Sequence, residues 1–149
     1  MLNKLNLAIV TTLAPAAVMA LPAAASYEKF EPTKAEVKAV ASTIAAKCPA
    51  KAGGPKYQLN CRDALITQSD ARLNTRYKRT MARLKAPRKT ELRDQERAWI
   101  LTRYDECNLL LEGVDYPAPG RKGEDYEIEA KDCIITENNR RTLWLDRYK

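Results

Sequence analysis

QLNCRDALITQSDARLNTRYKRTMARLKAPRKTELRDQERAWILTRYDECNLLL, residues 58–111, is the stretch that decides the fold of this chain. Apolar side chains recur in it three or four residues apart, which places them on one face of a helix. Pro87 interrupts the pattern, because a proline inside a helix removes a hydrogen bond and clashes with the preceding turn. We therefore predict a helix over about 57–85, a turn over 86–89, and a helix over 90–113 whose first residue, a threonine, is a good N-cap. Helices joined by so short a turn run antiparallel, as a hairpin.

Helical patterns also flank this hairpin. Thr33 and Glu36 have the spacing of a capping box and predict a helix that runs to about Lys47. Residues 113–131 are rich in Gly, Pro and charged residues and predict a long loop, and a final helix follows over about 132–148. No strand pattern is present. The sequence therefore predicts an all-α fold, a small disulfide-stapled helical bundle built on a long antiparallel helical hairpin.

The register of the hairpin follows from counting outward from the proline turn, because residues equally far from it lie level. Asp70 and Arg103 then face each other, and Tyr77 lies level with Trp99. Asp70 is on the apolar face, where a carboxylate is costly unless it is paired. We interpret Asp70 and Arg103 as a structural ion pair that fixes the register, in preference to a binding or catalytic pair. The amide of Asn74, one turn on, is placed to complete the network.

The first 25 residues have the form of a secretion signal. Lys4 precedes an uncharged apolar segment, and Ala23-Ala24-Ala25 fits a signal cleavage site. An uncleaved membrane anchor is the alternative, but prolines interrupt the apolar segment and it is shorter than the roughly 18 residues that a span needs. We therefore expect residues 1–25 to be removed and residues 26–149 to form one periplasmic or secreted domain. Its net charge is +6, because the whole chain carries +7 and the signal contains one lysine.

Four cysteines, Cys48, Cys61, Cys107 and Cys133, frame the hairpin. An even number of cysteines in an exported chain of this size indicates disulfides. A zinc site is disfavoured, because the chain has no histidine and no C-x-x-C pair. Three connectivities are possible, and we favour Cys48–Cys61 with Cys107–Cys133 over Cys61–Cys107 with Cys48–Cys133. We expect no cofactor and no bound metal.

Ordered motifs in the hairpin and the final helix resemble those of one known family. They are Leu59-Asn60-Cys61, Asp70-x-x-Leu73-Asn74-x-x-Tyr77, Gln95-Glu96-Arg97-Ala98-Trp99-Ile100, Arg103-x-x-x-Cys107 and Cys133-x-x-Thr136-x-x-x-Arg140-Arg141-x-Leu143. Together with the four cysteines they resemble the N-terminal domain of LprI-type lysozyme inhibitors. An aromatic-Arg-Asp triplet is usual before the third cysteine of that family, whereas this chain has Thr102-Arg103-Tyr104. The resemblance implies a small secreted or periplasmic helical domain and, for some members, inhibition of lysozyme.

The resemblance also implies a protein partner, a lysozyme-type glycosidase, in which two carboxylates act within a cleft. A basic loop tip, Arg121-Lys122 between Gly120 and Gly123, is the candidate element for insertion into such a cleft. A solvated surface turn has the same composition and is the alternative. An enzyme is not expected, because the chain has no histidine, no glycine-rich phosphate loop and no convincing pair of carboxylates.

A row of arginines is the second candidate binding feature. Arg72, Arg76, Arg79 and Arg83 follow spacings of four, three and four and so line one helix face. Such a row fits lipopolysaccharide phosphates or another acidic surface of the cell envelope, although it is more often the solvated face of an amphipathic helix. We expect no nucleic-acid partner, and another protein of the cell envelope remains an alternative to a lysozyme.

Overall fold

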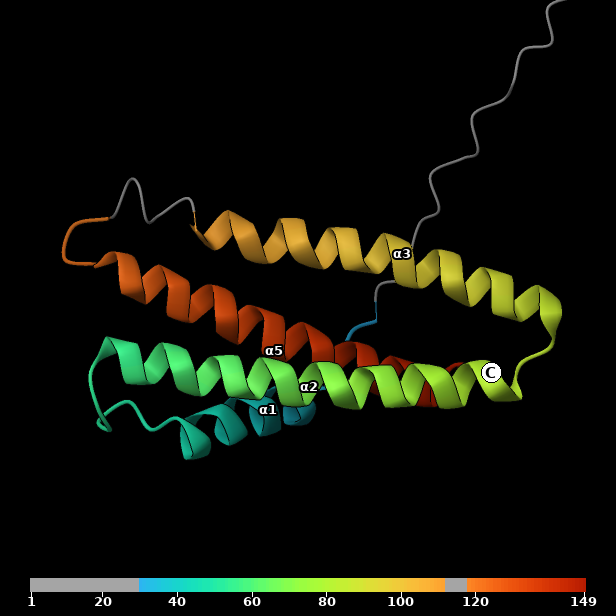
Figure 1. Cartoon of the computed structure of the whole chain (residues 1–149), viewed down its shortest axis with the longest axis horizontal. Helices are drawn as coiled ribbons and strands as arrows, with labels where there is room; N and C mark the ends of the chain where they lie inside the picture. Colours follow the sequence, from blue (N-terminus) through green and yellow to red (C-terminus); the bar gives the residue numbers. More distant parts are fainter. Residues whose placement is uncertain (1–29, 112–117) are drawn as a thin grey trace, which may run out of the picture.

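The computed structural model describes residues 30–111 and 118–149, which form helices joined by short connections (Figure 1). The elements are α1 (Lys34–Lys47), α2 (Pro55–Arg83), α3 (Ala86–Asn108), a short 3₁₀ turn η1 (Leu109–Leu111) and α5 (Gly123–Arg147). These two ranges contain no strand, so the predicted all-α class is confirmed. The predicted signal segment, residues 1–25, lies outside the described residues, as do residues 112–117.

The first helix begins where the sequence predicts. The Glu36 backbone N–H donates to the Thr33 hydroxyl at 3.2 Å, and the Thr33 backbone N–H donates to the Glu36 carboxylate at 2.8 Å. This capping box satisfies backbone donors that the start of a helix leaves unpaired. The hydrogen bonds from Thr33 hold the pKa of Glu36 below its ordinary value, and Arg147 of α5 adds to the effect. Arg147 lies 2.7 Å from the same carboxylate and ties α1 to the end of α5.

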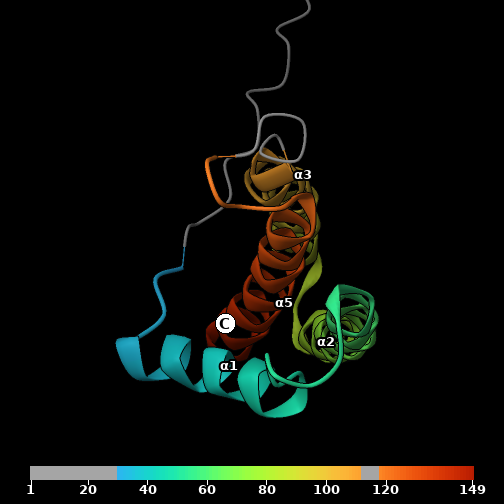
Figure 2. The ribbon, with the colours of Figure 1, turned by 90° about the vertical axis from the view of Figure 1, so that its left-hand side faces the viewer.

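α2 and α3 run in opposite directions and form the predicted hairpin (Figure 1). α5 runs parallel to α2, packs along most of its length, and also packs against α3. Seen along the bundle, α5 lies between the two arms, and α1 crosses below α5 and α2 (Figure 2). The final helix is therefore the central element of the bundle.

The start of α3 differs from the prediction. The sequence pattern predicts that Thr90 caps this helix, but α3 already begins at Ala86. Pro87 lies in the first turn, where its missing N–H costs no helical hydrogen bond and its fixed φ suits the helix. The connection between the arms is therefore only Leu84-Lys85, which we call the hairpin turn.

The start of α5 also differs, because the helix begins at Gly123, inside the predicted 113–131 loop. The Lys122 backbone N–H donates to the Asp125 carboxylate at 2.9 Å, which satisfies a donor at the helix start. Tyr126 is buried, so the first turn of the helix already packs against the bundle. The predicted loop is therefore wrong from Gly123 onward, and the final helix begins earlier than the sequence pattern predicts.

Two groups of buried side chains hold the helices together. The larger group lies on the side of the hairpin turn and joins α2, α3 and α5; its buried members are Leu73, Leu92, Trp99, Trp144, Leu145 and Tyr148. Tyr77, which the register places level with Trp99, packs against this group. The smaller group lies under α1 and consists of Ile44, Cys48, Leu65 and Ile135. Full burial of one such aliphatic or aromatic side chain contributes about 1.5–3 kcal/mol.

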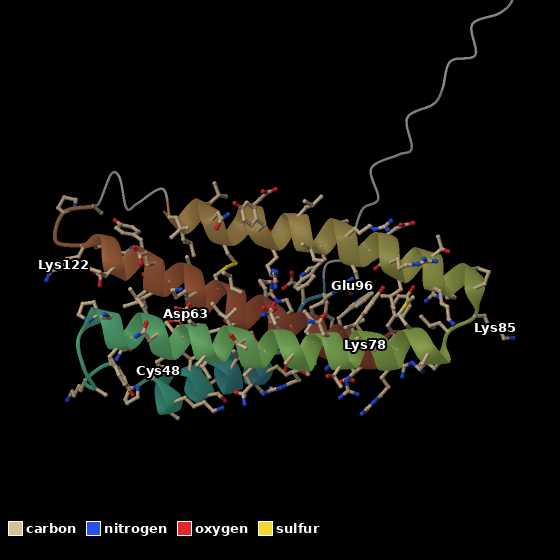
Figure 3. All side chains as sticks on the ribbon, viewed as in Figure 1. Cys48, Asp63, Lys78, Lys85, Glu96 and Lys122 are labelled. Carbon is tan, nitrogen blue, oxygen red and sulfur yellow. A yellow bond between two sulfur atoms is a disulfide. The ribbon has the colours of Figure 1, made fainter. Side chains whose placement is uncertain are left out.

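The disulfides are Cys48–Cys61 and Cys107–Cys133, which confirms the favoured connectivity. The first joins the end of α1 to α2 and the second joins the end of α3 to α5, with Cα atoms 5.9 and 5.6 Å apart. These separations are ordinary for disulfides. Figure 3 shows Cys48 and Lys85 toward opposite ends of the bundle.

Candidate functional site

A hydrogen-bonded node joins the three long helices. Arg103 Nη1 of α3 lies 3.4 Å from Asp70 Oδ1 of α2, so the predicted pair is present. Asn138 of α5 lies between them, and its amide nitrogen donates to Asp70 Oδ1 at 2.8 Å and to Ser69 Oγ at 2.9 Å. Its amide oxygen accepts a hydrogen bond from Arg103. Asn138, and not Asn74, therefore completes the network.

The Asp70–Arg103 pair is less buried than the register predicts. The two side chains are 43% and 21% exposed, because α5 holds the arms apart and leaves a cleft between them. The cleft has a volume of about 470 Å³. Its apolar lining consists of Leu73, Tyr77, Trp99 and Ile100, and its polar lining includes Asn74, Arg93, Glu96 and Arg97. Many of the family-like motif residues of the hairpin therefore meet in this cleft.

A buried ion pair lies at the cleft and joins α3 to α5. Arg141 Nε is 2.7 Å from Glu96 Oε1, and the Arg141 guanidinium carbon lies 3.6 Å from the centre of the Trp144 ring. Burial raises the pKa of Glu96, and the charge and hydrogen bond of Arg141 offset part of this rise. A carboxylate with a raised pKa marks structural pairs as well as catalytic sites. Here both partners are packed into the bundle and their geometry is that of a structural pair.

The predicted arginine row is divided between internal contacts and solvent. Arg76 lies 2.7 Å from Asp146 of α5, and Arg83 donates to two backbone oxygens at the end of α5. The last carbonyls of a helix have no partner within the helix, so Arg83 caps α5. Arg72 makes a hydrogen bond of 3.3 Å to an asparagine of α5, and Arg79 is exposed. The four arginines therefore do not form one free binding surface.

The predicted basic tip lies in the turn before α5, where Gly120 has a φ of +83° that favours glycine. The Arg121 guanidinium carbon lies 4.0 Å from the centre of the Tyr126 ring, and Arg121 pairs with Glu129 at 2.7 Å. The hydrogen bond to Glu129 raises the pKa of Arg121. Lys122 is exposed and points away from the bundle at its end (Figure 3). Of the two predicted cations, Arg121 is engaged by its own helix and Lys122 is available.

Large apolar side chains are exposed on the C-terminal half of α3. Leu101 and Tyr104 are each 67% exposed, and Ile100 is also exposed. Spacings of three and four residues place these side chains next to one another on the helix surface. We call Ile100, Leu101 and Tyr104 the α3 face. From the sequence we count Leu101, with Leu92 and Trp99, on the apolar stripe of the predicted 90–113 helix, but the structure turns Leu101 to solvent. A contiguous exposed apolar group on a small domain is a candidate interaction surface.

Charge is divided unequally along the bundle. Residues 72–97, around the hairpin turn, contain ten Lys and Arg and three Asp and Glu, a net of +7 that equals the charge of the whole chain. Residues 98–111 and 118–133, toward the other end, contain four Lys and Arg and seven Asp and Glu, a net of −3, whereas Lys47, Lys51, Lys56 and Arg62 lie at the same end on α1, α2 and the connection between them. We call residues 72–97 the basic end, and residues 98–111 with 118–133 the acidic segments. The α3 face belongs to the acidic segments.

The described residues contain neither a membrane span nor a metal site. Within residues 30–111 and 118–149, no helix combines the length and apolar character of a membrane span. In the same part of the chain, no group of three or more His, Cys, Asp or Glu side chains has the arrangement of a metal site. The features that remain as candidate sites are the cleft, the α3 face, Lys122 and the basic end.

Comparison with known proteins gives the family. Neither the curated proteins nor the solved structures gave a significant match. The family model described as lysozyme inhibitor LprI matches residues 48–145, which include all four cysteines, the node and the α3 face. Because this match covers well over half of the chain, the protein belongs to the LprI lysozyme-inhibitor family.

Proposed function

We propose that this protein is an exported inhibitor of lysozyme-type peptidoglycan glycosidases, acting in the periplasm or outside the cell after removal of residues 1–25. The observation that carries the proposal is the match of the LprI lysozyme-inhibitor model to residues 48–145. The two disulfides support the compartment, because disulfides persist in oxidising environments.

The α3 face is the main enzyme-contacting surface in this proposal. Tyrosine is enriched among the residues that carry most of the binding energy of protein interfaces, and Tyr104 supplies this chemistry. Leu101 adds exposed apolar area beside it. They stand on a helix whose last turn is fixed to α5 by the Cys107–Cys133 disulfide. A contact surface held on a rigid element loses little conformational freedom on binding.

The charge distribution supports this choice of surface. Animal c-type lysozymes are strongly basic, so a partner of uniform positive charge repels them at separations up to a Debye length of roughly 8 Å at physiological salt. The positive charge of this protein is concentrated at the basic end, whereas Asp105 and Glu106 lie beside the α3 face. Approach through the acidic segments therefore meets less repulsion than approach through the basic end.

Lys122 is the second contact in this proposal. An inhibitor of a lysozyme-type enzyme has to cover the cleft in which two carboxylates act. Lys122 is exposed, whereas Arg121 is held by Tyr126 and Glu129. We therefore assign to Lys122 alone the pairing with an enzyme carboxylate that the sequence suggests for the Arg121-Lys122 tip.

The first experiment measures inhibition directly. Purified oxidised protein is added to c-type, g-type and i-type lysozymes, and the clearing of a bacterial cell-wall suspension is followed by turbidity at low and high salt. We expect inhibition of at least one enzyme, stronger at low salt if that enzyme is basic. No inhibition at any ratio and either salt concentration would refute the proposed function.

The second experiment tests the surface. The Leu101→Ala/Tyr104→Ala variant should raise the inhibition constant tenfold or more, since loss of one interface hot spot costs about 2 kcal/mol or more. Lys122→Ala should raise it by a smaller factor. Val37→Ala/Tyr57→Ala is the matched control, because these side chains are also exposed but lie on α1 and at the start of α2. Equal effects of the two double variants would show that the enzyme binds elsewhere.

A further inference from the structure

The basic end carries more cations than it has carboxylates to pair with them. Each of its three carboxylates lies within 3.4 Å of one arginine; the pairs are Arg88–Glu91, Arg97–Asp94 and Arg141–Glu96. Arg76 pairs with Asp146 of α5. Seven of the ten cations are in no ion pair that involves the described residues. Two of these, Arg72 and Arg83, donate to neutral groups of α5, and the other five are Lys78, Arg79, Lys85, Lys89 and Arg93. These unpaired cations give the basic end a surplus of positive charge.

The surplus cations lie on α2 and α3 on both sides of the hairpin turn. Lys85 is at the hairpin turn, Lys78 is on α2, and both are labelled toward the same end of the bundle in Figure 3. Arg79 and Arg93 are also exposed, and only Lys89 is half-buried. Cations spread over the end of a bundle in this way can face many negative groups spread over a flat surface.

The same end lacks the side chains that nucleic-acid binding or membrane insertion uses. The exposed large apolar residues of the described chain lie elsewhere; they are Val37, Tyr57, Ile100, Leu101, Tyr104, Leu109 and Leu111. Stacking of single-stranded bases needs exposed aromatic rings, and insertion into a bilayer needs an apolar face. Neither is present around the hairpin turn, so contact there is electrostatic and peripheral.

We propose that the basic end docks this protein on an anionic phospholipid surface. Lys and Arg side chains near such a surface are attracted by its negative potential, and the attraction falls off within a Debye length. In this orientation the hairpin turn faces the lipid phosphates. The α3 face and Lys122, toward the other end of the bundle, stay open to solvent. Membrane docking is a second binding activity that does not depend on inhibition of any enzyme.

Vesicle binding tests the proposal with the oxidised protein that carries both disulfides. Co-sedimentation is measured with vesicles of phosphatidylcholine containing about one third phosphatidylglycerol, and with vesicles of phosphatidylcholine alone. The Lys78→Gln/Lys85→Gln variant should lose about 25-fold in partition coefficient on the anionic vesicles, since each cation contributes about fivefold. The Lys51→Gln/Lys56→Gln variant is the matched control, because it removes the same charge from exposed lysines at the other end of α2. It should lose less than threefold.

Three results would overturn the proposal. One is equal binding to anionic and neutral vesicles at low salt. Another is an equal loss in the two double-lysine variants, which would mean that net charge alone attracts the protein. The third is full competition by a short DNA duplex at low concentration, which would indicate a nucleic-acid surface. Selective binding to the anionic vesicles that is lost in high salt and in Lys78→Gln/Lys85→Gln supports the proposal, whatever the outcome of the lysozyme assay.

Discussion

Replacing Asn138 by alanine is the sharpest test of how the helices are joined. Asn138 of α5 is fully buried at 0% exposure, and its one amide group forms hydrogen bonds to both other long helices, α2 and α3. Asn138→Ala removes its hydrogen bonds to Asp70, Arg103 and Ser69 without introducing bulk. The change therefore isolates the polar node from the apolar packing around it.

The size of the effect follows from the partners of the amide. A hydrogen bond to a charged group contributes about 1.5–3 kcal/mol, and a neutral one about 1 kcal/mol. Asp70 and Arg103 are partly exposed, so water can replace part of the hydrogen bonding that they lose with the Asn138 amide. The lower end of the range, about 1.5 kcal/mol, therefore applies to each of these two bonds. With the bond to Ser69 included, Asn138→Ala should lower the free energy of unfolding by about 4 kcal/mol. In a domain of this size that is a fall in Tm of roughly 12–20 °C.

The assay is urea unfolding followed by circular dichroism, with thermal melting as a second measurement. Asn139→Ala is the matched control, since Asn139 is the next residue of α5 but bonds to Ile135 of its own helix and more weakly to Arg72. It should cost less than about 1 kcal/mol. If the two variants unfold within 1 kcal/mol of each other, the node does not hold the bundle together and the reasoning fails.

Three further variants probe other parts of the bundle. Replacing Cys107 and Cys133 together by serine should lower the free energy of unfolding by about 3.5 kcal/mol, because the disulfide spans 26 residues and its loss frees the unfolded chain; urea titration measures this. Burial raises the pKa of Glu96 in the folded state, so its carboxyl favours folding at acid pH and loses that contribution as pH rises from about 4.3 through the raised value. We therefore expect the free energy of unfolding of the wild type, minus that of Glu96→Gln, to fall as the pH rises over this range. A rise would contradict a raised pKa of Glu96 in the folded state. Arg83→Ala should cost about 1–3 kcal/mol and speed amide exchange at the end of α5, whereas Arg79→Ala should stay within about 0.5 kcal/mol of the wild type.

The sequence predicts well those features that neighbouring residues decide. Thr33 and Glu36 are three residues apart and need only each other to start a helix, so the capping box is readable. The disulfide pairing is only favoured by the sequence, because Cys61–Cys107 with Cys48–Cys133 is also geometrically possible, and the structure shows the favoured pairing. The start of α5 at Gly123 is not readable in this way. Its first turns contain glycine and many charges, and only the burial of Tyr126 in the assembled bundle makes them a packed helix.

The role of Asn138 in the central node cannot be predicted from the sequence for a similar reason. Asn138 lies within Glu137-Asn138-Asn139-Arg140-Arg141, a polar run that reads as a solvated helix face. Its role appears only when α5 lies between α2 and α3, an arrangement that no local pattern specifies. The assignment of Leu101 to the apolar stripe, in contrast, is wrong for a reason that the sequence itself contains. Leu101 follows Trp99 by two residues, about 200° around a helix, so one core cannot bury both.

The positions of the two disulfides determine how the molecule responds to proteolysis. A cut after Lys51, in the connection between α1 and α2, leaves the two pieces joined through Cys48–Cys61. A cut after Lys122 leaves α5 joined to the hairpin through the other disulfide. Trypsin-like enzymes can therefore nick both connections without releasing a fragment. The hairpin turn has no such covalent bridge, so cleavage after Lys85 leaves the arms held only by noncovalent contacts with α5, which include the apolar packing, the Asn138 node and the Arg76–Asp146 pair.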